Sequence, residues 1–179
     1  MNFIKPICLF VLLALASFPA WPAEDPTMLV FKQLSGLVGG WAGKSPSGRE
    51  NKVNYRLTAG GTVLVETWSL SSGRESMTMY HIDGETLIAT HYCPQGNQPR
   101  LVLMPDDEKL SFAFHDGTNL HIPGKAHQYS FWLKIIDGEH FQRNEIYVEN
   151  NVVIDKPPVE DPQETFSYTR ISAPTSAEK

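Results

Sequence analysis

Two residues with reactive side chains, His91 and Cys93, lie two positions apart in the segment 86–93. We expect this segment to be one of the β-strands of the chain, with Leu87 and Ala89 on the same face as His91 and Cys93. Because alternate strand residues point to one face, the imidazole and the thiol are expected about 6.5–7 Å apart on the same side. At that spacing they could meet one metal or haem iron, or the imidazole could lower the pKa of the thiol. The alternative is that both pack in a barrel wall, with the histidine hydrogen-bonded.

Glu66 is a carboxylate on an otherwise apolar strand face, which it shares with Leu64, Trp68 and Leu70. A carboxylate among large apolar side chains is costly unless it is paired. Glu66 therefore either faces solvent or serves as a polar group inside a pocket. Candidate partners are the arginines of the expected strands, in a structural or a ligand-binding role: Arg56, Arg100, Arg143 and Arg170.

Three histidines at intervals of six residues, His115, His121 and His127, suggest a zinc site. The turn residues at 116–117 and 123–124 break any single strand through these histidines. Their regular spacing in the sequence therefore does not imply that the three side chains lie close together in space. The sequence contains no nucleophile-elbow, phosphate-loop, H-E-x-x-H or C-x-x-C signature.

The elements that must position these residues are mostly strands. Apolar residues in 26–38 recur at intervals of three and four, which predicts one short amphipathic helix. After Trp41 the period changes to two, and turn signals, strongest at Asp83-Gly84 and Asp137-Gly138, recur mostly every 10–13 residues. This pattern predicts an all-β, antiparallel up-and-down barrel of about 8–10 strands, because closure removes exposed sheet edges. A β-sandwich is the alternative.

Length and composition indicate one exported domain. The chain has 179 residues and a formal net charge of -5, which argues against a nucleic-acid partner. Residues 1–23 have the pattern of a signal peptide, with cleavage expected after Ala20 or Ala23, so we expect a periplasmic or secreted protein without a membrane anchor. The barrel domain is expected over 24–171 and a disordered tail over 172–179. Removal of Cys8 leaves Cys93 alone, so no internal disulfide is expected.

Several motifs resemble those of an uncharacterised, often exported bacterial family with a lipocalin-like, calycin-type barrel. They are G-G-T-V-L-V-E-T-W at 60–68, T-H-Y-C at 90–93 and N-Q-P-R at 97–100, with L-S-G-L-V-G-G-W at 34–41 and M-Y-H-I-D at 79–83. Gly39-x-Trp41 also resembles the opening motif of lipocalins, and Arg170 resembles the arginine that packs across that tryptophan. The family's His-x-His pattern is absent at His127, which follows Lys125-Ala126. The resemblance implies mainly the fold.

We therefore expect a barrel that binds a small, largely apolar ligand, by analogy with related barrels. Its polar end is expected at Glu66, Trp68, His91, Cys93, Gln98 and Arg100. Further residues expected to line the cavity or to fill a dry core are Met77, Met79, Phe112, Phe114, Phe131 and Trp132. One alternative is a haem- or metal-binding barrel using His91, Cys93 or His127. Another is a hydrolase-type enzyme in which Cys93 or Glu66 acts with His91. Oligomeric state and cofactor are left open.

Overall fold

A computed structural model describes residues 25–70, 72–152, 154, 156 and 158–172. The expected signal peptide, residues 1–23, lies outside the described residues, as do residues 173–179 of the expected tail. Within the described part, no helix is both long enough and apolar enough to cross a membrane.

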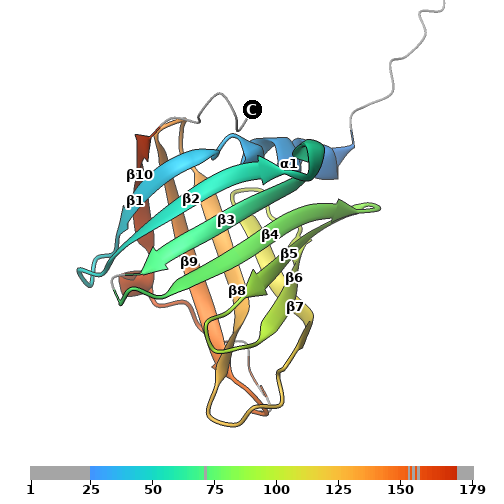
Figure 1. Ribbon diagram of the computed structural model, residues 1–179, viewed down its shortest axis with the longest axis vertical. Coiled ribbons are helices and arrows are strands. Elements are labelled where there is room, and N and C mark those ends of the chain that lie inside the picture. The colour runs from blue at the N-terminus through green and yellow to red at the C-terminus, as the bar shows by residue number, and fades with distance from the viewer. Residues whose placement is uncertain (1–24, 71, 153, 155, 157, 173–179) are drawn as a thin grey trace, which may run out of the picture.

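The chain forms a closed barrel of ten antiparallel strands, which confirms the predicted fold class (Figure 1). Each strand pairs with the next along the chain, and the first pairs with the last to close the barrel. In chain order the strands are β1 (Gly39–Lys44), β2 (Glu50–Thr58), β3 (Val63–Leu70), β4 (Glu75–Asp83), β5 (Thr86–Tyr92), β6 (Gln98–Met104), β7 (Leu110–Thr118), β8 (Ala126–Ile135), β9 (His140–Glu149) and β10 (Phe166–Ser172). Short 3-10 helices, η1 (Ala59–Gly61) and η2 (Pro162–Glu164), precede β3 and β10.

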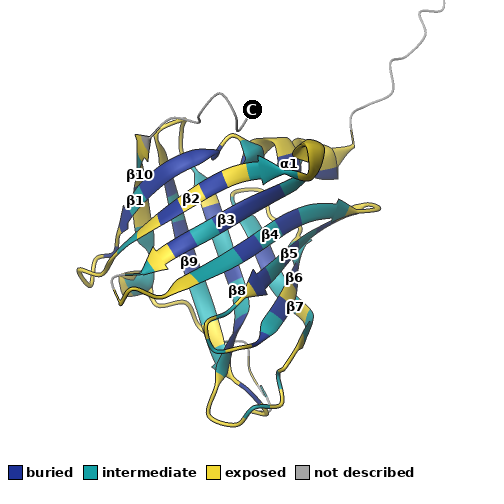
Figure 2. Ribbon diagram, viewed as in Figure 1, coloured by how far each residue is buried: buried dark blue, intermediate teal, exposed yellow. Residues whose placement is uncertain are grey.

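Burial alternates along the strands as the sequence pattern predicts (Figure 2). On β2, Val53 and Tyr55 are buried, whereas Asn54 and Arg56 are exposed. The apolar residues on the inner face form one core cluster that continues to the N-terminal helix.

Helix α1 (Pro26–Ser35) closes one end of the barrel (Figure 1). The Asp25 side chain caps it by accepting a hydrogen bond from the Thr27 backbone N–H. Thr27 also donates its hydroxyl to the Glu85 carbonyl in the β4–β5 turn, which fixes the helix across the barrel end. Phe31 and Leu34 are buried against the core.

Trp41 and Arg170 lock the chain that leads from α1 into β1. The Trp41 indole N–H donates to the Leu37 carbonyl at 2.7 Å. The Arg170 guanidinium lies 4.1 Å from the centre of the Trp41 ring and donates to the Val38 carbonyl at 2.7 Å. The arginine thus packs across the tryptophan in the manner expected from the sequence.

The lumen has two parts, and among the described residues a helix covers one end of it. Towards α1 it is filled by packed rings, with Phe112 stacked on Phe131 at 4.7 Å and Tyr80 edge-on to both. In an up-and-down meander, alternate hairpins lie at the same end. The β1–β2, β3–β4 and β5–β6 turns therefore surround the other end, which we call the mouth.

Candidate functional site

A cavity of about 490 Å³ opens at the mouth. Its lining combines aromatic rings with charged and polar side chains. The lining residues are Arg49, Asn51, Trp68, Leu70, Arg74, Ser76, His91, Cys93, Pro94, Gln95, Arg143, Glu145, Tyr147, Glu164, Phe166 and Tyr168. They come from strands far apart in the sequence, which only the closure of the barrel brings together.

Four of the six residues predicted for the polar end come together here. Trp68, His91 and Cys93 line the cavity, and Glu66 contacts Trp68 from the adjacent inward position of β3. Gln98 and Arg100 lie instead on the outer face of β6. There the exposed Arg100 forms an ion pair with Asp116 of β7, which is also exposed to solvent.

The other residues considered for the cavity lining take different places. Met77 and Met79 alternate with the buried Thr78 on β4, and Trp132 lies between two buried residues of β8, so these three side chains belong to the outer face. Phe112 and Phe131 fill the packed half of the lumen. Of the predicted aromatic residues, Trp68 lines the cavity, and sequence reasoning missed Phe166 and Tyr168.

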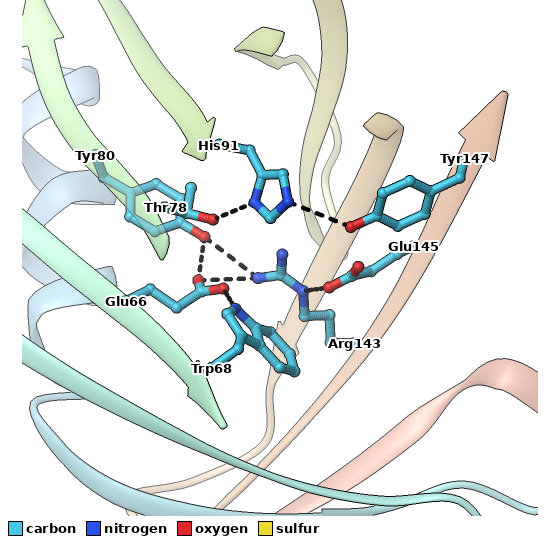
Figure 3. A network of polar contacts seen from close by, with 8 residues as sticks. All are labelled: Glu66, Trp68, Thr78, Tyr80, His91, Arg143, Glu145 and Tyr147. Carbon is cyan, nitrogen blue, oxygen red and sulfur yellow. Dashed lines mark hydrogen bonds and ion pairs between the residues drawn. The ribbon is translucent and has the colours of Figure 1, made fainter. Parts of the chain in front are cut away.

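A buried network centred on Glu66 and Arg143 forms the inner end of the cavity (Figure 3). The two carboxylate oxygens of Glu66 accept hydrogen bonds from the Trp68 indole, the Tyr80 hydroxyl and Arg143 Nη1. Arg143 Nη1 also donates to the Tyr80 hydroxyl at 3.2 Å, and its Nε donates to Glu145 at 2.7 Å. Among the candidate arginines, Arg143 is therefore the partner of Glu66.

Burial and charge act in opposite directions on this pair. Burial raises the pKa of the Glu66 carboxyl, and Arg143 partly offsets this effect. Burial alone would lower the pKa of Arg143, but Glu66 and Glu145 together raise it well above its ordinary value. Three donors and no acceptor face the Glu66 oxygens, so the carboxylate is the form that the geometry stabilises.

His91 is held between β4 and β9. Its Nδ1 lies 3.1 Å from the Thr78 hydroxyl, and its Nε2 lies 3.5 Å from the Tyr147 hydroxyl, which is long for a hydrogen bond. Burial lowers the pKa of His91 to about 4, with Arg143 adding to the effect and Glu145 opposing it. The imidazole is therefore neutral near pH 7.

Glu145 and Tyr147 of β9 are site residues that sequence reasoning missed. Both face the cavity, and the Glu145 side chain keeps 26% of its surface exposed there. Burial opposes ionisation of Glu145, but Arg143 prevails and lowers its pKa. The usable signal was the alternation of β9, which places Glu145 and Tyr147 on the same face as the apolar Phe141.

An ion pair between Arg49 and Glu164 joins two loops at the rim of the mouth. The Ser47 backbone N–H donates to the Gln163 carbonyl at 3.3 Å across the same junction. The Arg49 guanidinium also lies 5.6 Å from the centre of the Phe166 ring. The β1–β2 hairpin is thereby attached to η2 beside the cavity.

Cys93 lacks the surroundings of an activated thiol. Burial raises its pKa, and the neighbouring His91 is neutral near pH 7, so the geometry provides no imidazolium to stabilise a thiolate. His127 lies elsewhere, with its Nδ1 at 2.8 Å from the Asn150 side-chain oxygen. Within the described part of the chain, no three or more His, Cys, Asp or Glu residues gather as a metal site. The metal, haem and enzyme alternatives stay predictions.

Fold and cavity together define an up-and-down, lipocalin-like β-barrel with one open end. Comparison of the chain with protein-family models and with curated proteins found no match. The resemblance to an exported bacterial family thus stays a prediction from the sequence motifs.

Replacement of Glu66 tests the buried network. Glu66→Gln removes the charge opposite Arg143 and turns an amide N–H₂ towards neighbouring donors. We expect a loss of about 3 kcal/mol in the free energy of unfolding, measured by urea denaturation at pH 7. Glu164→Gln, which removes one partner of the solvent-exposed ion pair with Arg49, is the matched control, with an expected loss under about 1 kcal/mol. Equal losses in the two variants would contradict the assigned role of Glu66.

The buried neutral His91 predicts a pH dependence of stability. Its folded-state pKa of about 4 lies below the ordinary value of 6.5, so the unfolded chain binds the proton first as pH falls. The contribution of neutral His91 to the free energy of unfolding is fully present above pH 6.5 and is lost as pH falls towards 4. Between pH 7 and pH 5, the parent should lose about 2 kcal/mol more than His91→Gln in urea unfolding.

The exposed His115 provides the control for this measurement, because His115→Gln should keep the pH dependence of the parent. If His91→Gln and the parent lose the same free energy between pH 7 and pH 5, His91 is not the buried neutral group described above.

Proposed function

We propose that the protein binds a small, largely apolar ligand with one polar end inside the barrel. The observation that carries this proposal is the cavity of about 490 Å³ at the uncovered end. Ligand sites for small molecules typically have volumes of about 300–1,000 Å³ and combine an apolar wall with a few placed polar groups. The cavity has both properties.

The wall offers flat rings to the apolar body of the ligand. Tyr168 is stacked on Phe141 at 4.4 Å, and Trp68 lies edge-on to Tyr168 at 5.9 Å. Phe166 continues the row, with its ring centre 6.0 Å from that of Tyr168. Because these rings already support one another, ordering them on binding costs little, which favours affinity.

The polar end of the ligand is accommodated at the inner end of the cavity, where Arg143, Glu145 and His91 converge. Gln98 and Arg100, which the sequence predicts at the polar end, lie on the outer face of the barrel and take no part in this binding mode. We further propose that the protein acts in the periplasm or as a secreted protein. That proposal rests on the signal-peptide pattern of residues 1–23 and on the family resemblance of the motifs.

A matched pair of serine substitutions tests whether ligands enter the lumen. Ser76 faces the cavity from β4, whereas Ser69 is exposed on the outer face of β3. An indole at Ser76 fills part of the cavity, so Ser76→Trp should weaken the binding of Nile red, a neutral apolar dye, by about tenfold. Ser69→Trp should change it by less than about twofold. Dye fluorescence during titration with folded protein gives both affinities.

Absence of Nile red binding by the parent protein would contradict the proposed function. Equal weakening by the two tryptophans would place the dye outside the cavity.

A further inference from the structure

The inner end of the cavity contains a donor that no described residue satisfies. Arg143 uses Nε for Glu145 and Nη1 for Glu66 and Tyr80, but its buried Nη2 has no hydrogen-bond partner within the described part of the chain. Figure 3 shows this nitrogen pointing away from Glu66, on the side of His91. A buried unsatisfied donor costs free energy that an acceptor on a ligand would recover.

An acceptor group stands beside this donor. The Glu145 side chain is partly exposed to the cavity and accepts hydrogen bonds from Arg143 Nε and from the Tyr147 hydroxyl. A carboxylate has about four lone-pair sites, so these two donors leave room for a further one. The lowered pKa of Glu145, which burial opposes and Arg143 produces, keeps it ionised. A ligand that reaches Arg143 therefore also meets a carboxylate that can accept a hydrogen bond.

Charge decides which polar group fits between them. With Glu66 and Glu145 ionised, the two carboxylates outnumber the single guanidinium at the inner end, so a ligand carboxylate would add a third negative charge. The two other cations of the lining lie at the rim and not at the inner end: Arg49, which is paired with Glu164, and Arg74, which is exposed in the β3–β4 turn. The polar group that fits this end is uncharged, accepts a hydrogen bond from Arg143 and donates one to Glu145.

We propose that the inner end of the cavity recognises the uncharged carboxamide of an aromatic ligand and discriminates against the corresponding carboxylate. The amide oxygen accepts from Arg143 Nη2, and the amide N–H donates to Glu145, while the ring lies against Trp68 and Tyr168. This specificity rests on the proposed function, because it requires that ligands occupy the cavity.

Two probes with the same ring, 2-naphthamide and 2-naphthoate, differ at pH 7 in charge and in the ability to donate a hydrogen bond. Each is used to displace Nile red from the full chain. We expect 2-naphthamide to bind about tenfold more tightly than 2-naphthoate. In Glu145→Gln, which removes one negative charge, the preference should fall by about tenfold. Glu85→Gln removes an exposed charge in the β4–β5 turn, at the α1 end, and should leave the preference unchanged.

The outcomes separate the two proposals. If Nile red binds but 2-naphthoate displaces it as well as or better than 2-naphthamide, the carboxamide assignment is overturned and the proposed function stands. The same holds if neither probe displaces the dye, or if Glu145→Gln keeps the preference of the parent. If neither the dye nor the probes bind, both proposals fail.

Discussion

The buried ion pair between Glu66 and Arg143 is the interaction on which the interior of the barrel depends. It joins β3 to β9 across the lumen, and both side chains are almost completely removed from solvent. The guanidinium contacts the Phe131 ring of the packed half at 4.2 Å and the Trp68 ring of the cavity wall at 4.9 Å. The pair therefore stands at the boundary where the apolar core ends and the polar cavity begins.

This placement connects stability with recognition. A buried ion pair is often no more stabilising than apolar residues of similar volume, but loss of one partner is costly. The pair holds a guanidinium in a fixed orientation, with Nε and Nη1 occupied and Nη2 left for another acceptor. The same charges that fix Arg143 also make the inner end unfavourable for anionic ligands, so the polar network explains both the shape of the cavity and its proposed selectivity.

Local patterns in the sequence predict the barrel well and the site only in part. Alternation and Asp-Gly turns are short-range signals. They are enough for the antiparallel meander and for which residues share a strand face, such as Glu66 with Trp68 and His91 with Cys93, but not for which face points inward. The choice of Arg143 among four arginines depends on contacts between distant strands, which spacing does not encode. On β9 two signals disagree. Alternation from the apolar Phe141 turns Glu145 inward, whereas the apolar Ile146 and Val148 beside Glu145 favour the opposite face. The N-Q-P-R motif predicts Gln98 and Arg100 at the site, but their side chains lie on the outer face of β6.

The most direct test of the central claim is a crystal structure of the protein with 2-naphthamide bound. The account predicts the naphthyl ring against Trp68 and Tyr168, with the amide oxygen within hydrogen-bond distance of Arg143 Nη2 and the amide nitrogen beside Glu145. A ligand bound on the outer face, or one whose amide points out through the mouth, would contradict it.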